Sequence, residues 1–376
     1  MGTKEFAAPI WMRLGEAASK ANHIAGVPLD PEVAHSMLQL FLAKGALATT
    51  AIEGNTLTEA QAVAQVKGEL KLPPSQQYLQ QEMANIIDAC NWICKELGSD
   101  NKHVIDVKFC CLLNEMVLSK LEVDEGVVPG EIRHHNVVVG NVYRGAPAED
   151  CFFLMERMCE VIEETDATGE YRHQTAILIA LFAHVYMALI HPFGDGNGRT
   201  ARLLEFYILM RCGFAMPTGH LLSNHYNKTR NVYYRELDRV SKSGGALSSF
   251  VNYALEGFVD GLKEQIALIR QEQMRVTWEH YVHSQFHDKK TAADHRRRDL
   301  VLALGERDEW IKLTDLPMLN TTLAVEYAAK TEKTISRDLN VLQEMQLIRK
   351  APRRVRANQQ RIKAWLPWSA LGNGDA

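Results

Sequence analysis

Apolar residues recur every three to four positions along most of the chain, which is the spacing of helices that bury one face. Alternating apolar and polar positions, typical of strands, are scarce before residue 290. The pattern predicts helices over residues 31 to about 53, from 58 onward, 77–97, 104–121, 151–164, 172–190, 198 or 199 to 211, and 248–282. The predicted fold class of this body is therefore all-α.

Two helix starts carry clear capping residues. Asp30-Pro31-Glu32 supplies an N-cap, a proline for the first turn and a first-turn acid, and the helix that begins there should end near Gly54-Asn55. Thr58-Glu59 marks a second start.

The segment between Gly126 and Pro147 departs from the helical pattern. Pro129-Gly130 is typical of a turn, Val137–Val139 is rich in β-branched residues, and Gly140-Asn141 is a hairpin-type turn. These features predict one β-hairpin within the helical body.

The polar run His287–Lys290 predicts a domain boundary, and a different pattern follows it. The pattern predicts a short helix at 323–329, a tight turn at 330–332, a second helix at 334–342 with Ile335, Leu339 and Leu342 inward, and a basic ribbon from 347–350 and 353–356 that ends at 362–365.

Composition restricts the classes of protein to which the chain can belong. Its 376 residues, 46% hydrophobic and 23% charged, are typical of two or three globular domains and exclude a disordered chain. The uncharged stretch Thr175–Ile190 would reach about 24 Å as a helix, less than the ~30 Å of a membrane core, so we expect a core helix and no membrane partner. Because no secretory signal is visible, we expect a cytoplasmic protein with reduced cysteines, which lack metal-site spacing.

Charge is distributed unevenly along the chain. Residues 291–376 contain 15 Lys and Arg against 11 Asp and Glu, a net charge of +4, whereas the whole chain has a net charge of −4. A modestly basic C-terminal segment therefore follows an acidic body.

Residues 191–202, HPFGDGNGRTAR, combine features of a phosphate-binding loop. Pro192 disfavours helical geometry at His191, so the preceding helix should end there and expose the imidazole. An unperturbed imidazole is mostly neutral at pH 7 and can accept a hydroxyl proton. Gly196–Gly198 then form a permissive turn into a new helix, whose unpaired N–H groups and dipole favour an anion.

Charged residues of the same loop extend this chemistry. Arg199 and Arg202 lie three positions apart and can approach one anion, and Asp195 is a hard oxygen ligand suited to Mg²⁺. Together these groups predict phosphoryl or nucleotidyl transfer. The loop is not a Walker loop, and Phe206 stands where a calcium-binding EF-hand needs Glu. The alternative is that these side chains only hold a helix turn together.

The loop resembles the Fic (filamentation induced by cAMP) family, because it fits H-P-F-x-[D/E]-G-N-G-R-x-x-R at every defined position. The resemblance implies a helical Fic core with a hairpin flap. It also implies transfer of AMP from ATP, with Mg²⁺, to a Ser, Thr or Tyr hydroxyl of a target protein or of the chain itself. The expected domains are an N-terminal helical region (1–103), the catalytic domain (104–262), a connecting helix (263–290) and a C-terminal domain (291–376).

The resemblance carries residue roles by position. It implies that His191 is the catalytic base, that Asp195 holds Mg²⁺, that the Gly196–Gly198 turn holds the α-phosphate, and that Arg199 and Arg202 hold the outer phosphates. The nucleotide-binding residues that it implies are Val137, Val138, Val139, Gly140, Asp195, Gly196, Asn197, Gly198, Arg199, Thr200, Ala201, Arg202, Tyr233 and Tyr234.

Two further segments are similar to parts of the family. Pro129–Arg133 and Val137–Gly140 match the P-G-x-x-R and V-x-V/I-G runs of a flap, whose exposed edge can pair with an extended target segment. The alternative is a purely structural hairpin. Tyr233-Tyr234 resembles the aromatic pair of the adenine pocket, and the alternative is core packing.

Thr49–Gly54 matches the inhibitory motif [S/T]-x-x-x-E-[G/N] of related proteins. The resemblance implies that Glu53 pairs bidentately with Arg202 and so occupies the arginine that a γ-phosphate needs. The alternative is an ordinary Glu-Gly helix end. A second expected role for Glu53 is to position a water that removes AMP from a modified target, and whether this reverse reaction occurs is left open.

The C-terminal segment resembles the winged helix-turn-helix modules of bacterial regulators. DNA contact through residues 291–367 would use Lys333 and Arg337 in the groove and the ribbon arginines on phosphates, and the alternative is protein contact or a homodimer. Two functions therefore stay open: an adenylylating enzyme with a targeting module, and a DNA-binding regulator whose Fic body senses nucleotide without turnover. The intact loop favours the enzyme.

Overall fold

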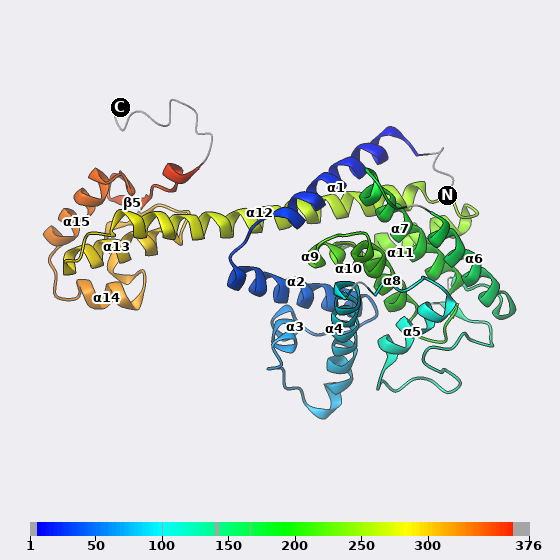
Figure 1. The fold of residues 1–376 in the computed structure, drawn as a ribbon. Coiled ribbons are helices and arrows are strands. Elements are labelled where there is room, and N and C mark those ends of the chain that lie inside the picture. Colours follow the sequence, from blue (N-terminus) through cyan, green and yellow to red (C-terminus); the bar gives the residue numbers. More distant parts are fainter. Residues whose placement is uncertain (1–5, 100, 140–142, 166, 364–376) are drawn as a thin grey trace. The chain divides into compact units, whose positions relative to one another are not determined.

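The structure, a computed structural model, describes residues 6–99, 101–139, 143–165 and 167–363. The chain divides into two compact units, Met1–Ile266 (unit 1) and Ala267–Ala376 (unit 2), and each is described by itself. Helices dominate both units (Figure 1), which confirms the predicted all-α fold class.

Unit 1 consists of helices with one short hairpin. In chain order its elements are α1 (Ala8–Gly26), α2 (Pro31–Ile52), α3 (Glu59–Val66), η2 (Pro74–Gln76), α4 (Gln77–Gly98), α5 (Val107–Leu118), β1 (Val138–Val139), β2 (Tyr143–Arg144), η3 (Ala148–Asp150), α6 (Cys151–Glu164), α7 (Arg172–Ile190), α8 (Asn197–Arg211), α9 (Met216–Gly219), α10 (Leu221–Lys228), α11 (Arg230–Lys242) and the first part of α12 (Ser248–Gln285).

The predicted helices are present, with ends shifted by a few residues. The Asp30 carboxylate accepts from the N–H of Glu32 at 2.9 Å, and Thr58 forms a reciprocal capping box with Gln61. The sequence pattern does not indicate α1 or α9–α11, and none of these helices has a side-chain hydrogen bond at its N-cap. The predicted hairpin is present, but its turn residues Gly140 and Asn141 lie outside the described residues.

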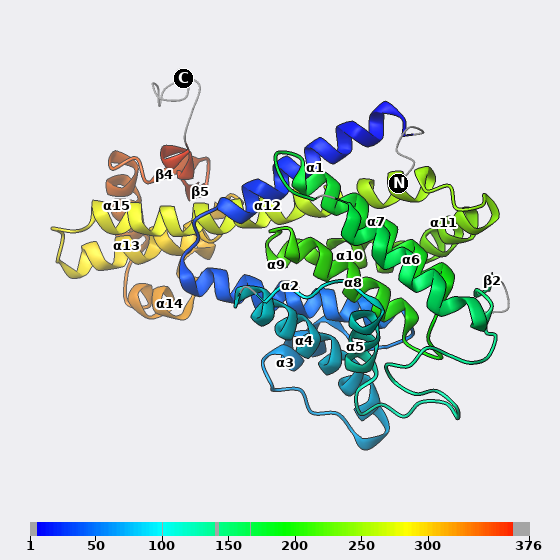
Figure 2. The ribbon, with the colours of Figure 1, turned by 45° about the vertical axis from the view of Figure 1, so that its right-hand side comes forward.

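The helix pair α7–α8 forms the centre of unit 1. α7 is long and apolar enough to cross a membrane by length and composition, yet 67% of its apolar stretch is buried, as a core helix requires. α8 is buried along most of its length, with Leu204, Tyr207 and Ile208 fully enclosed. Helices α2 and α4, which are blue and blue-green in Figure 2, pack against α8, which is green.

Helix α2 is seated closely on the start of α10. A Cβ at Gly45 would overlap the imidazole of His220, so only glycine allows this approach. His220 is 4% exposed and stacks on Phe206 of α8, with ring centroids 4.6 Å apart. This packing fixes the position of α2, whose last turn contacts the first part of α8.

Unit 2 contains the end of α12 and a small mixed domain. Its elements are α13 (Ala292–Gly305), β3 (Ile311–Lys312), η4 (Leu313–Met318), α14 (Thr321–Tyr327), α15 (Glu332–Glu344), β4 (Ile348–Ala351), β5 (Arg354–Ala357) and η5 (Gln359–Ile362). The strands form an antiparallel sheet in the order β3-β5-β4. Leu339 and Leu342 of α15 are buried in its core with Trp278, and Ile335 is partly buried there, as predicted.

The C-terminal ribbon differs from the prediction at its two ends. β3 adds a third strand, which is too short to leave a sequence pattern. The ribbon stops at Ala357, because Gln359–Ile362 form a 3₁₀ turn instead of continuing it; the predicted end at Ala364-Trp365 lies outside the described residues.

A buried ion pair lies inside this domain. Asp338, 1% exposed, accepts hydrogen bonds at 2.8 Å from the Nε atoms of Arg296 and Arg297. The winged helix-turn-helix assignment stays a prediction.

Candidate active site

Helix α7 ends at His191, as Pro192 predicts. His191 adopts a left-handed conformation, with φ 52° and ψ 56°, and its N–H closes the helix on the carbonyl of Met187. The half-buried imidazole has Nδ1 3.3 Å from the carbonyl oxygen of Ala188. Because a carbonyl only accepts, Nδ1 carries the proton of the neutral ring, and Nε2 keeps a lone pair that can take a proton.

Burial lowers the pKa of His191. The hydrogen bond to the Ala188 carbonyl opposes this effect, and the charge of Arg133 adds to it, so the pKa lies below the usual 6.5. The imidazole is therefore neutral at pH 7, which is the form that accepts a proton.

The turn between His191 and α8 is held by its own asparagine. The side-chain amide of Asn197 donates to the carbonyl of Phe193 at 2.8 Å and accepts from the Phe193 N–H at 2.9 Å. Gly196 takes φ +75°, which glycine adopts without strain. The first helical bond of α8 runs from the Thr200 N–H to the Gly196 carbonyl at 2.8 Å, so the first N–H groups of the helix have no helical partner. This helix start can bind an anion.

Thr200 and Ala201, predicted to bind nucleotide, are fully buried. The Thr200 hydroxyl accepts from the side chain of Asn114 at 3.1 Å. The Thr200 N–H is also used within the helix, so the predicted contact of these two residues with a nucleotide stays a prediction.

Asn114 of α5 is a structural residue of the site that sequence reasoning missed. Its buried side-chain nitrogen donates to the carbonyl of Asp195 at 3.0 Å, and its oxygen accepts from the Gly130 N–H at 3.0 Å. One amide therefore joins α5, the loop and the predicted flap. An isolated Asn in an apolar helix pattern gives no signal for this role.

Arg133 connects the predicted flap to the end of α7. Its Nε donates to the His191 carbonyl at 2.7 Å, and Nη2 donates to the Ala146 carbonyl at 2.5 Å. Its backbone N–H donates to the Pro192 carbonyl at 2.9 Å. A buried cation thus satisfies carbonyls at a helix C-terminus, which is the end where the dipole favours positive charge. The flap motif in the sequence includes Arg133, but it does not indicate that this side chain binds the carbonyls at the end of α7.

The hairpin pairs Val138 with Arg144 and Val139 with Tyr143. The backbone N–H of Gly145 donates to the Val137 carbonyl at 3.3 Å, and Val138 is 63% exposed. An isolated bridge between Ile132 and Phe193 brings the base of this segment to the loop. Gly140, a predicted nucleotide-binding residue, lies outside the described residues.

Arg202 of α8 is held by the end of α2. Its Nη2 donates to Oε1 of Glu53 at 2.6 Å, its Nε donates to the Thr49 hydroxyl at 2.6 Å, and Nη2 also meets the Thr49 carbonyl at 2.9 Å. The predicted ion pair between Glu53 and Arg202 is present, but the prediction that it is bidentate is wrong, because one nitrogen of Arg202 bonds one oxygen of Glu53. Thr49 takes the second edge of the guanidinium because it lies one helical turn before Glu53 on α2.

The Glu53 carboxylate lies directly at the start of α8. A Cβ at Gly198 would overlap its Oε1, so the absence of a side chain at Gly198 gives the carboxylate room in this position. Burial raises the pKa of Glu53, but the charge and hydrogen bond of Arg202 outweigh burial, and the pKa falls below its usual value. Glu53 is therefore ionised at neutral pH and lies where an external anion would meet the helix.

Arg199 and Arg202 contact different carboxylates of the protein, and their predicted approach to one phosphate-bearing ligand stays a prediction. Nη1 of Arg199 donates to Glu82 of α4 at 2.9 Å, and its Nη2 lies 3.2 Å from both carboxylate oxygens of Asp195. Glu82 in turn accepts from the side chain of Asn55 at 2.9 Å. Each arginine is thus neutralised by a different carboxylate of the N-terminal helices, and no sequence motif indicates Glu82.

The two tyrosines occupy different environments. Tyr233 is 2% exposed, and its hydroxyl lies 2.9 Å from Nε2 of the buried His184. Tyr234 is 42% exposed, and its hydroxyl donates to the Ile52 carbonyl at 3.4 Å. Tyr233 is therefore a core residue in this structure, whereas Tyr234 lies at the end of α2 beside Glu53.

A helical fold in which a neutral histidine ends one helix, and an anion site with two arginines begins the next, corresponds to a known family. Residues 104–209 match the model of the Fic/DOC family. This match over residues 104–209 confirms the resemblance seen in the sequence.

Curated relatives are similar over the same region. The chain is 30% identical over 208 residues to "Protein adenylyltransferase fic-1" of Caenorhabditis briggsae, covering 54% of this chain and 37% of that protein. It is 33% identical over 164 residues to "Protein adenylyltransferase Fic" of Drosophila willistoni, covering 43% and 31%. The chain thus spans about a third of the length of these relatives.

Solved structures share the fold. A Fic family protein from Desulfovibrio desulfuricans G20 has a TM-score of 0.57 at 20% identity, covering 94% of this chain and 96% of that chain. A segment of Fic-1 from Caenorhabditis elegans has a TM-score of 0.57 at 23% identity, covering 69% and 73%. At these identities the likeness is one of fold.

The role of Asn114 can be measured. Asn114→Ala is expected to lower the free energy of unfolding by about 2–3 kcal/mol, because the Gly130 N–H and the Asp195 carbonyl lose their buried partner. Urea unfolding of the full chain is the measurement. Asn91→Ala, at an exposed position of α4, is the control and should stay within about 0.5 kcal/mol of the original chain. Equal stability of the two variants would contradict the role assigned to Asn114.

Proposed function

We propose that the chain is a protein adenylyltransferase, which moves AMP from ATP to a Ser, Thr or Tyr hydroxyl of a target protein or of itself. The observation that carries the proposal is the neutral imidazole of His191 beside the unpaired N–H groups of α8. The names of the curated relatives support the same activity. The alternative of a DNA-binding regulator without turnover has no support in these comparisons.

The proposed reaction uses the loop as follows. The α-phosphate of ATP rests on the Gly196–Gly198 turn, and the target hydroxyl oxygen forms a bond to the α-phosphorus. Nε2 of His191 takes the hydroxyl proton, the bond from the α-phosphorus to the bridging oxygen breaks, and pyrophosphate leaves with that electron pair. Arg199 and Arg202 face the outer phosphates. In support, Nε of Arg199 and Nη1 of Arg202 are buried and have no hydrogen-bond partner within the described part of the chain.

Asp195 fits the requirement of Mg²⁺ for a carboxylate together with substrate phosphates. Its side chain is 50% exposed and is the carboxylate of the loop itself. A bound Mg²⁺ would neutralise phosphate charge at this place. Among the described residues, no group of three or more His, Cys, Asp and Glu could hold a metal ion by itself.

Glu53 is proposed to restrain the reaction. Its carboxylate lies against Arg202 and the start of α8, so a γ-phosphate must displace it to reach the same arginine. The same carboxylate is placed to orient a water that removes AMP from a modified target.

For unit 2 we propose contact with DNA. Lys333 and Arg337 are exposed one turn apart on α15, and Arg353 and Arg354 are exposed at the tip of the β4–β5 ribbon. Both elements can therefore present cations to phosphates.

The first prediction of this proposal concerns Glu53 and His191. Glu53→Gly is expected to raise transfer of radiolabelled AMP from ATP by about 10- to 150-fold, since a hydrogen bond between charged groups contributes about 1.5–3 kcal/mol. His191→Ala in the same background should remove the label. Glu122→Gly, in an exposed loop, is the control. Equal labelling with and without His191 would overturn its assignment as the base.

The second prediction concerns pH. In the Glu53→Gly protein the rate of AMP transfer should rise with pH and become constant, with its midpoint below pH 6.5, because the base must be neutral and burial lowers the pKa of His191. The rate at saturating ATP between pH 5 and 8 is the measurement. His35→Gln, at an exposed position of α2, should leave the midpoint unchanged. A rate that falls as pH rises would contradict the assignment.

The third prediction concerns unit 2. The full chain should retard a random DNA duplex in a gel at about 50 mM salt and lose this effect at about 200 mM. Lys333→Glu/Arg337→Glu should abolish retardation, whereas Lys67→Glu/Lys71→Glu, at exposed positions of unit 1, should weaken it less. Absence of retardation at low salt, with a dimer detected by sedimentation, would favour protein contact instead.

A further inference from the structure

A groove of about 1030 Å³ lies between α5, segment 129–134 and α6, and we call it the α5–α6 groove. It is separate from the candidate active site, because His191, Asp195, Arg199 and Arg202 do not line it. Its volume is at the upper end of small-molecule pockets, about 300–1,000 Å³, so it is large enough for a polypeptide segment.

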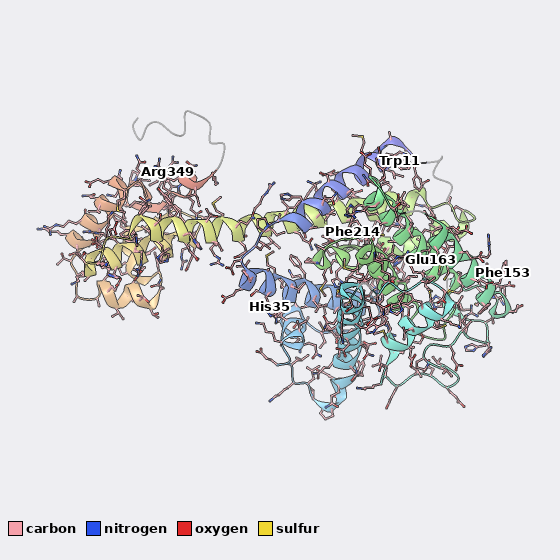
Figure 3. The ribbon with its side chains drawn as sticks, viewed as in Figure 1. Trp11, His35, Phe153, Glu163, Phe214 and Arg349 are labelled. Atoms are coloured by element: carbon pink, nitrogen blue, oxygen red, sulfur yellow. The ribbon has the colours of Figure 1, made fainter. Side chains whose placement is uncertain are left out.

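The lining of the α5–α6 groove includes apolar side chains. Ile105, Leu112 and Ile132 contribute to it, and Val104 and Phe152 are 65% and 56% exposed. Exposed apolar side chains of this size, gathered in a hollow, are typical of a binding surface. Figure 3 labels Glu163, which also lines the groove, and Phe153, which follows Phe152 on α6 but does not line it.

The charge of the α5–α6 groove is strongly negative. Its carboxylates are Asp106, Glu115, Glu131, Glu156, Glu160 and Glu163, whereas the basic residues that line it within the described part of the chain are Lys108 and His134.

Half of these carboxylates are used within the fold. Asp106 caps α5, Glu160 pairs with Arg157, and Glu163 accepts from the Ile105 N–H at 2.8 Å. The other three, Glu115, Glu131 and Glu156, are exposed and have no ion pair among the described residues. The groove therefore presents uncompensated negative charge around apolar surface, and a basic partner with apolar side chains complements it.

The negative charge of the groove also affects the pKa of Cys111, which lies on α5 in the groove lining. Burial raises its pKa most, and the charges of Asp106, Cys159 and Glu131 raise it further, to about 11. Two carboxylates thus act on the groove lining from α5 and from segment 129–134.

The α5–α6 groove is continuous with the predicted flap. The backbone that lines it at Ile132 also bridges Phe193 of the catalytic loop, and the chain then runs directly into β1 at Val138. A polypeptide bound in the groove therefore lies beside the segment whose free edge can pair with an extended chain.

We propose that the α5–α6 groove docks a basic segment, rich in lysine or arginine and containing apolar residues, of the protein whose hydroxyl is modified. This inference rests on the proposed adenylyltransferase function. The groove binds residues of the target that flank the acceptor hydroxyl. Because the groove is acidic, this contact favours basic targets, whereas backbone pairing with the flap does not distinguish targets by charge.

Binding is tested with two fluorescein-labelled peptides that alternate charged residues with leucine around one serine, one with lysine and one with glutamate. In fluorescence polarisation at about 50 mM salt, the lysine peptide should bind the full-length chain at least tenfold more tightly than the glutamate peptide. Glu115→Lys/Glu156→Lys should weaken its binding at least tenfold. Glu149→Lys/Glu164→Lys, exposed and outside the groove, changes the net charge equally and should weaken binding less than threefold.

Phe152→Ser and Phe153→Ser separate apolar contact from charge, because they are neighbours with similar exposure and only Phe152 lines the groove. Phe152→Ser should weaken binding about fivefold and Phe153→Ser less than twofold. Equal binding of the two peptides, or equal loss in both charge-reversed pairs, overturns the inference.

Binding needs no chemistry, which separates this inference from the proposed function. If the Glu53→Gly protein transfers AMP to the lysine peptide but the groove substitutions change neither its Kd nor its KM, docking in the groove is wrong and the transferase stands. If the peptide binds in the groove and no AMP transfer to any hydroxyl is detected, the proposed function is wrong and the groove stands as a binding site for basic polypeptides.

Discussion

The candidate active site depends on one constraint, that two helix ends meet across a short loop. The end of α7 leaves carbonyl groups to satisfy, and the start of α8 leaves N–H groups. Arg133 satisfies the carbonyls from the side of the hairpin, and Asn197 and Asn114 hold the loop through their amides. The N–H groups at the start of α8 are left for an anion, so the packing that closes one helix end leaves the other available for chemistry.

The N-terminal helices act on this anion site through charge. Glu53 reaches Arg202, and Glu82 reaches Arg199, so the two arginines proposed to hold phosphates are both neutralised by helices outside the matched Fic/DOC region. Desolvating two arginines without such partners would be costly, since a buried unpaired charge destabilises a fold by several kcal/mol. Under the proposed function, the carboxylates that stabilise these two arginines are the groups that the outer phosphates of a nucleotide would have to displace.

Much of this arrangement could be predicted from the sequence, because local rules decide it. The helices with N-cap residues, the end of α7 before Pro192 and the contact of Glu53 with Arg202 each follow from a few neighbouring residues or a matched motif. The roles of Asn114 and Glu82 could not be predicted, since each depends on partners more than 80 positions away in the chain. The prediction of a bidentate pair between Glu53 and Arg202 was wrong for a related reason. The Thr49 hydroxyl accepts from the same guanidinium, and only the packing of α2 on α8 places this hydroxyl there.

The energetics of α2 indicate how Glu53 could leave Arg202. Moving the whole helix would break the packing of Gly45 on His220 and both contacts of Thr49, and it would also pull on Asn55, whose amide donates to the Leu79 carbonyl at 2.9 Å. Turning the Glu53 side chain alone breaks one hydrogen bond to the arginine, at a cost of about 1.5–3 kcal/mol, and this side chain is already 32% exposed. The second route costs less, so a ligand that gains only a few kcal/mol from Arg202 can displace Glu53 while α2 stays in place.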